Sequence, residues 1–348
     1  MTIPSADDQI RFLRDIQALL DDGQFTATYK FALLIALSDI AVESGVADGR
    51  TLWIDVDAVA AKLIDYYWQQ SSPFLGRDAA QVLLQNNGRQ AAIVSELVRL
   101  RNEGIASLAE LRASGVLYRK AVRKVARITR DMPLFRLQLV AGEPRPFLYA
   151  HELVDGGIRL HPGVAYHLRQ FHTLITGMAR DRWTSMVRQM RENLYLVGQT
   201  RDLETFLFGS AREPIRHRLD MLLDAQRGRC LYCSLEIAPA SAHVDHFVPW
   251  ILHRCDALPN LVAAHSECNL AKKDWLAAEI HLERWVRRNL EWDPPESIPT
   301  HPGDAWTWDT VKSLTRWAYD RAYDLGLPTW VRRRETARLS PGYVRFFH

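Results

Sequence analysis

Side chains that can bind a metal ion or transfer a proton gather in one stretch of the sequence, residues 229–274. Cys230 and Cys233 form a C-x-x-C pair, and His265 and Cys268 form an H-x-x-C pair. Two intervening residues let both members of a pair reach one ion, and a tetrahedral set of thiolate and imidazole ligands is typical of structural zinc. The sequence therefore predicts a zinc site formed by these four residues.

The cysteine distribution supports this prediction. All four cysteines of the chain lie in the same stretch, which in a reducing compartment favours metal ligation over a disulfide framework. Cys255 has no partner at short spacing and is an alternative to His265 as the fourth ligand. We expect His265 to be the ligand and Cys255 to be structural, because only His265 belongs to a spaced pair.

Four polar residues that zinc does not use remain in the stretch: Asp245, His246, Asn260 and Asn269. Asp245 and His246 end a short apolar segment that predicts a strand. Neighbours on a strand face opposite sides, so both can reach one site only if the strand ends there, and Pro249 favours such an end. Asn260 falls in the following loop, and Asn269 is expected near the start of a helix.

The order of these residues resembles that of the HNH endonucleases. Their ββα-metal core has a D-H pair at the end of the first strand, a central Asn in the next loop and C-N-x-x-K at the helix. The corresponding sequences here are VDH at 244–246, NL at 260–261 and CNLAK at 268–272. The resemblance covers roughly residues 215–285. His265 departs from it, since many zinc-containing members have Cys at this position.

The resemblance implies a role for each catalytic residue. His246 would be the general base that removes a proton from the attacking water, because imidazole exchanges protons near neutral pH. Asp245 and Asn269 would hold one hard divalent cation, Mg²⁺ or Mn²⁺, through oxygen. Asn260 would hydrogen-bond across the loop and fix the backbone of His246. The products would carry 5′ phosphate and 3′ hydroxyl ends.

Three further polar residues of the stretch have weaker assignments. The resemblance makes Lys272 a candidate catalytic residue that contacts phosphate, with Lys273 as the alternative nucleic-acid contact. His243 is expected to be structural or to lie near the substrate.

The region before this stretch is expected to deliver the substrate. Apolar residues at helical spacing predict helices over 8–21, 27–43 and 55–68. The helix expected over 116–130 is amphipathic, and its positive stripe makes it a candidate nucleic-acid contact. The basic residues that we assign to that contact are Arg119, Arg123, Lys124 and Arg127.

After this basic helix the apolar pattern changes to alternation. Phe135, Leu137 and Leu139 predict a strand, the GEPRP sequence predicts a turn, and 147–149 predict a second strand, with a third expected at 158–160. Helices followed by a basic helix and a hairpin are the order of a winged-helix module, which we place at about 88–160. An ordinary solvated helix face remains the alternative.

The fold class expected is therefore mainly α, with a small β-hairpin or meander in the middle and a C-terminal ββα-metal module embedded among helices. Its expected domains are a helical recognition domain at 1–200, the nuclease domain with flanking helices at 201–293, and a helical extension at 294–348.

Composition restricts the function less than the motifs do. Lys and Arg number 44 against 41 Asp and Glu, so the net charge of +3 barely favours anionic partners. The acidic start lacks a secretory pattern and the apolar window at 31–42 is too short for a membrane span. We expect a cytoplasmic protein that does not contact a membrane.

Three functions fit these residues. The first is a metal-dependent DNA endonuclease with a structural Zn²⁺ ion. The second is a zinc-dependent DNA-binding module without catalysis, against which the joint presence of Asp245, His246 and Asn269 argues. The third is a ribonuclease effector, because the same groups act on any phosphodiester. By analogy alone, a role in restriction or phage defence follows, with a homodimer or a defence-system protein as partner.

Overall fold

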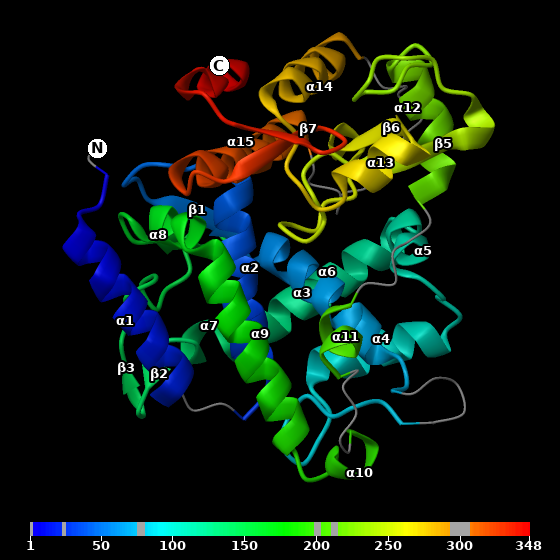
Figure 1. Cartoon of the computed structure of the whole chain (residues 1–348). Helices are drawn as coiled ribbons and strands as arrows, with labels where there is room; N and C mark the ends of the chain where they lie inside the picture. The colour runs from blue at the N-terminus through cyan, green and yellow to red at the C-terminus, as the bar shows by residue number, and fades with distance from the viewer. Residues whose placement is uncertain (1–2, 23–25, 75–80, 198–202, 210–214, 293–306) are drawn as a thin grey trace. The chain divides into compact units, whose positions relative to one another are not determined.

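The computed structural model of the protein describes residues 3–22, 26–74, 81–197, 203–209, 215–292 and 307–348. Within these ranges the chain divides into two compact units, the first ending at Gly209 and the second beginning at Ile215. Helices dominate both units, and the sheets of the described residues are antiparallel pairs of strands (Figure 1). The mainly α fold class is confirmed.

The first unit is built around helix α2 (Tyr29–Glu43), which is apolar on all sides and is therefore buried in the middle of the unit. It packs between α3 (Val56–Trp68) on one side and α9 (His172–Gln189) on the other. Asp55 caps α3 by accepting a hydrogen bond from the Asp57 amide. Besides the basic helix α6 (Val116–Asp131), the other described α-helices of this unit are α1 (Ala6–Asp22), α4 (Ala92–Asn102), α5 (Leu108–Ala113), α7 (Pro133–Arg136), α8 (Val164–Gln170), α10 (Leu194–Val197) and α11 (Leu203–Phe208).

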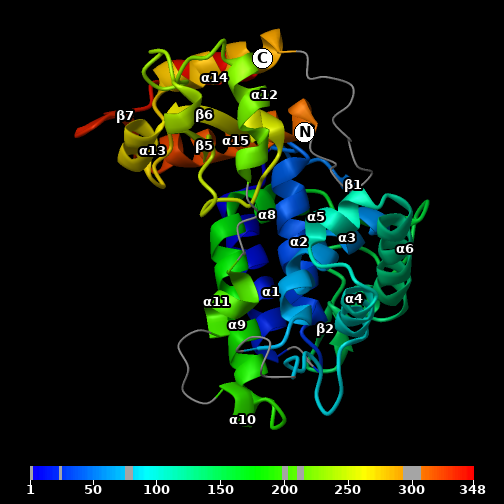
Figure 2. The same ribbon diagram turned by 90° about the vertical axis from the view of Figure 1, so that its right-hand side faces the viewer.

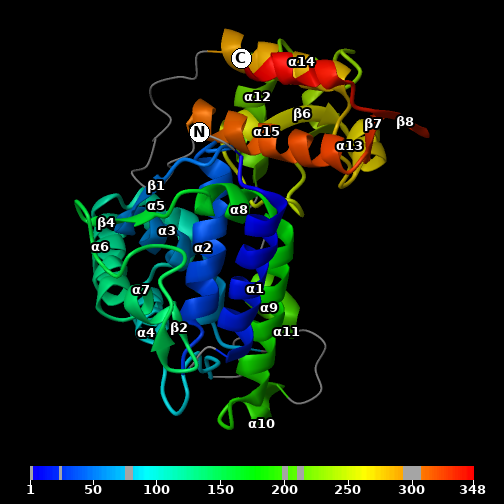
Figure 3. The same cartoon turned by 90° about the vertical axis from the view of Figure 1, so that its left-hand side faces the viewer.

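The basic helix is α6 (Val116–Asp131), close to the predicted range. It packs on α3, and Figures 2 and 3 show it at the edge of the first unit with α3 between it and α2. Tyr118, Ala121 and Val125 are buried beneath it, which leaves the basic stripe on the outer side.

The strand predicted from Phe135 to Leu139 is wrong. Residues Pro133–Arg136 form the short helix α7, and Pro133 occupies its first position, where proline favours a helical start. Leu134 and Leu137 are buried while Phe135 is exposed, so burial follows the i, i+3 spacing of a helix. The hairpin itself exists but is short, with β2 at Leu139–Val140 and β3 at Glu143–Pro144.

The predicted third strand, β4 (Gly157–Leu160), does not extend that hairpin. It pairs with β1 (Leu52–Asp55), a strand that lies about a hundred residues earlier and that we did not predict. The Trp53 ring covers Gly157, where a Cβ atom would lie 2.7 Å from that ring, so the pairing requires glycine there.

The second unit contains two short strands and a helix, namely β5 (Ala242–His246), β6 (Leu261–His265) and α13 (Ser266–Lys272). Helix α12 (Leu219–Ala225) precedes them. The elements that follow are α14 (Glu279–Glu291), α15 (Trp308–Asp324), β7 (Pro328–Arg332) and β8 (Glu335–Arg338).

The C-terminal segment packs within the second unit. Phe247 stacks on Trp285 of α14, with ring centroids 4.9 Å apart, and lies beside Tyr319 of α15. The described part of the segment expected as a helical extension also contains the β7–β8 hairpin, so it is not purely helical. None of the helices in the described part of the chain has the length and apolar character of a membrane span.

Candidate active site and zinc centre

The chemical groups of the second unit are positioned by β5, β6 and α13. The antiparallel register sets Ala242 opposite His265 and His246 opposite Leu261. Because β6 ends at His265 and α13 begins at the next residue, a single turn of chain brings the residues of α13 next to both strands.

The predicted zinc ligands form one cluster. The ligand atoms of Cys230, Cys233, His265 and Cys268 all lie within 4.8 Å of one another. Tetrahedral zinc, with bonds of about 2.0–2.3 Å, separates its ligand atoms by roughly 3.5 Å, so the cluster has a suitable size. The Nε2 of His265 lies 3.0 Å from the carbonyl oxygen of Glu236, and this bond leaves Nδ1, which is 3.2 Å from the Cys233 sulfur, as the metal-binding nitrogen.

The electrostatics of the cluster also fit a cation. Burial raises the pKa of Cys230, and burial together with the neighbouring sulfurs raises the pKa of Cys268. Burial also acts to raise the pKa of Cys233, but hydrogen bonds led by the Leu235 amide outweigh it and lower that pKa. A divalent cation relieves the repulsion between crowded thiolates, so this Cys₃His site fits a structural zinc ion. Cys255 is buried and lies outside the cluster.

Asp245 is buried beside α13, and its Oδ2 atom is held from two sides. It accepts a 2.5 Å hydrogen bond from the Tyr232 hydroxyl and lies 3.1 Å from the Nζ of Lys272. Burial and the Asp245 carboxylate raise the pKa of Tyr232 well above its usual value, so the phenol keeps the proton that it donates. Among the described residues, neither Oδ1 of Asp245 nor the side-chain amide of Asn269 has a hydrogen-bond partner. These two groups offer the oxygen donors that a hard cation needs.

Lys272 is fully buried and links α13 to the end of β5. Its Nζ donates to the carbonyl oxygen of His246 at 2.9 Å and pairs with Asp245. A side chain without exposed surface has little to offer a phosphate that arrives from solvent. The neighbouring Lys273 is exposed, and the phosphate contact expected of this lysine pair fits its position better.

The imidazole of His246 is oriented by a carboxylate that the sequence analysis did not single out. Nε2 of His246 lies 2.7 Å from Oδ1 of Asp256, and the ring packs against Trp250. This bond assigns the ring proton to Nε2, because a carboxylate can only accept, and it leaves Nδ1 as the basic nitrogen. A proton acceptor with a fixed tautomer is the group that a general base requires.

Comparison with known families now shows what this arrangement is similar to. Residues 230–274 match the family model described as HNH endonuclease. We refer to this matched segment as the HNH module. Residues 9–140, within the first unit, match a domain of unknown function, DUF8808. No curated protein and no solved structure matches the chain. The HNH family in general consists of nucleases, and the Cys₃His site agrees with a zinc-containing member.

The central asparagine of the HNH module closes the loop between β5 and β6. The fully buried Asn260 accepts a hydrogen bond from the Val248 amide at 2.9 Å and donates to the carbonyl oxygens of Val248 and Cys255. We expected Asn260 to fix the backbone of His246. Its contacts hold the residues that follow His246, whereas Lys272 holds the His246 carbonyl itself.

Other residues singled out from the sequence lie outside this arrangement. His243 is exposed on β5 and shares a strand face with Asp245, two residues on. The four basic residues assigned to nucleic acid are exposed on α6 in the first unit. Lys124 among them pairs with the buried carboxylate of Glu96 at 2.5 Å, so part of its charge is already neutralised.

The sequence did not indicate the roles of two residues of the HNH module, Tyr232 and Asp256, which contact Asp245 and His246. Tyr232 lies between the two cysteines of the C-x-x-C pair, a position that the motif leaves open. Asp256 is a carboxylate between the D-H pair and Asn260, and this placement was the available indication of its role.

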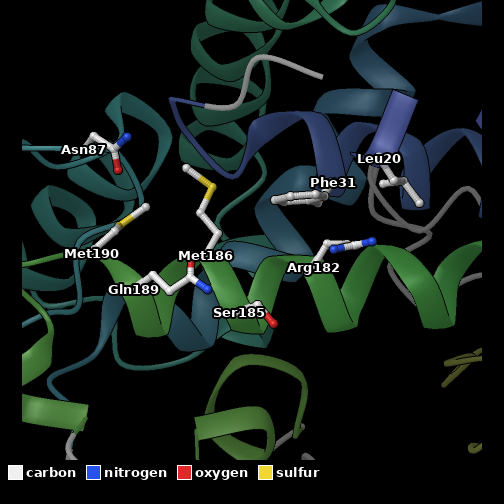
Figure 4. Close-up of a pocket in the computed structure, with 8 residues that line it drawn as sticks. All are labelled: Leu20, Phe31, Asn87, Arg182, Ser185, Met186, Gln189 and Met190. Carbon is white, nitrogen blue, oxygen red and sulfur yellow. The ribbon is translucent and has the colours of Figure 1, made fainter. Parts of the chain in front are cut away.

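A cavity of about 380 Å³ lies in the first unit, lined by α1, α2 and α9 residues together with Asn87 and Met190 (Figure 4). Arg182, which lines it, pairs with Asp21. Its lining side chains include no titratable group besides Arg182, so it offers no chemistry comparable to that of the HNH module.

Proposed function

We propose that this protein is a metal-dependent endonuclease that hydrolyses phosphodiester bonds in DNA. The observation that carries the proposal is the HNH match over a ββα unit that contains Asp245, His246 and Asn269 and, in the same segment, the Cys₃His cluster. A protein that used the zinc fold only to bind DNA would need neither the buried carboxylate nor the imidazole with its fixed proton.

His246 acts as the general base in this proposal. Nδ1 takes the proton from the attacking water, while Asp256 accepts the Nε2 proton and stabilises the imidazolium that forms. Asp256 is therefore a positioning residue, since it acts through His246. The carbonyl of His246 is held by Lys272, so the backbone that carries the base cannot move away from α13.

Asp245 and Asn269 would hold a Mg²⁺ or Mn²⁺ ion through oxygen. When bound, this cation supplies positive charge to the scissile phosphate and to the leaving 3′ oxygen. Tyr232 and Lys272 occupy Oδ2 of Asp245 and so orient its carboxylate with Oδ1 available. Cleavage leaves 5′ phosphate and 3′ hydroxyl ends.

Target recognition is assigned to residues 1–200 of the chain, with the nuclease domain at 201–293 and a C-terminal extension at 294–348. Helix α6 would bind the DNA backbone through Arg119, Arg123 and Arg127, which have no acidic partner among the described residues. We place the activity in the cytoplasm, where reducing conditions preserve thiol ligands. Restriction or phage defence, with a homodimer or a second defence protein, is the biological role that we propose by analogy.

The test is cleavage of a supercoiled plasmid with Mg²⁺ or Mn²⁺, with chelator as the control. His246→Ala should abolish cleavage while zinc content and folding are retained. DNA binding without cutting by the wild-type protein would instead identify a zinc-dependent DNA-binding module. Cleavage of RNA alone would identify a ribonuclease. Unmodified DNA, modified DNA and RNA should be compared in the same assay.

A further inference from the structure

The second unit contains a basic hairpin that the proposed mechanism does not use. Strands β7 and β8 pair antiparallel, and Arg333 and Arg334 form the turn between them. Figure 3 shows the two strands projecting from the rest of the second unit. All side chains from Arg332 to Arg338 are exposed, so the end of the hairpin makes little contribution to a core.

The charge of this hairpin is largely uncompensated. Arg332 pairs with Glu335 across the turn. Arg333, Arg334 and Arg338 have no acidic partner among the residues that the structure describes. Three unpaired guanidinium groups in six residues give this end of the hairpin a local positive charge that the near-neutral whole chain does not show.

The backbone at the turn does not favour arginine. Arg334 has φ of +64°, in the left-handed region that glycine and asparagine adopt more readily than a long side chain. Its side chain is exposed and forms no hydrogen bond or ion pair with the described residues that would offset this strain. Residues kept in such conformations often serve a binding function.

The base of the hairpin is fixed to the HNH module. Trp330 is buried against Tyr232 and His281, with ring centroids 5.2 Å away in both cases. Its backbone is hydrogen-bonded to Leu276 and Ala278 just beyond α13. Because Tyr232 also donates to Asp245, the hairpin is two contacts away from the carboxylate of the active site.

We propose that the β7–β8 hairpin binds the phosphate backbone of duplex DNA next to the bond that the HNH module cuts, an inference that rests on the proposed function. Three to four residues of strand separate Trp330 from the tip, a reach of about 10 Å. Successive phosphates of one strand rise about 3.4 Å along the duplex axis, so a tip about 10 Å from Trp330 along that axis would lie about three base pairs away. Guanidinium groups bind phosphate oxygens in pairs, which provides affinity and register without reading base sequence.

Equilibrium DNA binding tests this surface without cleavage. The Arg333→Gln/Arg334→Gln pair is compared with a matched pair, Arg287→Gln/Arg345→Gln, at exposed arginines of the same unit. Both are made in the His246→Ala protein with zinc retained, and affinity for a duplex is measured at several salt concentrations. Loss of two phosphate contacts should lower the slope of log affinity against log salt by about 2, whereas the control pair should leave it unchanged.

Arg334→Gly separates binding from folding. Glycine adopts a positive φ readily, so this variant should keep or raise the melting temperature while the salt slope falls by about 1. Equal slopes for the hairpin pair, the control pair and the parent would overturn the proposal.

Cleavage by the protein with His246 intact distinguishes this inference from the proposed function. A protein that binds DNA through the hairpin and never cuts it would disprove the nuclease function and support the hairpin surface. A protein that cuts DNA with no dependence on the hairpin arginines would support the nuclease function and overturn the hairpin surface. If the protein binds no DNA at all, both are overturned.

Discussion

The two units of this protein are stabilised in different ways. In the first, α2 is buried along nearly its whole length and carries a continuous apolar core. In the second, short strands are joined to α13 through the Cys₃His cluster and buried polar contacts, while aromatic rings from α14 and α15 cover one side. The candidate catalytic groups therefore lie in the unit that contains the candidate zinc site. We predict that loss of a zinc ion from this site impairs the proposed chemistry while the first unit stays folded.

Removing a zinc ligand tests this contrast most strongly. Structural zinc contributes about 10–16 kcal/mol in zinc-finger peptides, which is comparable to the whole stability of a domain. Cys230→Ser should therefore lose zinc, cleavage and the thermal transition of the second unit, and the first unit should still unfold cooperatively. Metal analysis and circular dichroism melts measure this. Cys255→Ser, outside the cluster, is the matched control and should keep its zinc. Unaltered melting of Cys230→Ser would show that the second unit does not need the ion.

A mutation that creates a cavity in the apolar core of the first unit tests whether that unit is stabilised independently of zinc. Leu33 on α2 is fully buried, and Leu33→Ala should lower the free energy of unfolding of the first unit by about 3 kcal/mol. Zinc content should not change. Denaturant titration followed by circular dichroism measures the effect. An equal shift in the unfolding of the second unit would show that the two units unfold together.

Asp256→Asn should separate chemistry from stability within the second unit. Without the carboxylate, the proton position and the charge on His246 are no longer fixed, so kcat should fall by about 100-fold, equivalent to about 2.7 kcal/mol. KM for DNA and zinc content should change little, and Asp256→Glu should restore part of the rate. Asp274→Asn, at an exposed carboxylate just after α13, is the control. A change in KM alone would assign Asp256 to substrate binding.

The smallest effect is expected at α6. Arg123→Glu/Arg127→Glu should weaken DNA binding by about tenfold at moderate salt and reduce its salt dependence, without changing kcat. Arg11→Glu/Arg14→Glu on α1 reverses the same charge elsewhere on the first unit. Unchanged affinity and salt dependence would remove α6 from the interface.

The features that could be predicted from the sequence are those formed by residues close together in the chain. The zinc ligands form two short pairs, and the amphipathic pattern of α6 lies within one helix, so neither depends on distant packing. The strand error at 135–139 arose because alternation and helical spacing coincide over a few residues, and the burial of Leu134 together with the exposure of Phe135 distinguishes them. The β1–β4 pair joins strands a hundred residues apart, for which no local pattern exists.

The same reasoning explains which residues of the candidate active site the sequence predicted and which it did not. Asp245, His246 and Asn269 follow a motif in sequence order. The contacts of Tyr232, Asp256 and Lys272 depend on which side of a loop or helix faces inward, and residue types alone do not determine this. Lys272 shows the limit clearly, because a lysine in a nuclease motif suggests phosphate, whereas here it is inside the fold.

The burial of Lys272 also suggests the order in which the protein would bind its two metal ions. The ammonium group of Lys272 balances the charge of Asp245 and donates a hydrogen bond to the His246 carbonyl. Zinc would be acquired once, during folding. The catalytic cation that we propose would then bind a preformed site without reorganising the chain, so we predict that hydration of the ion, and not protein motion, limits its exchange.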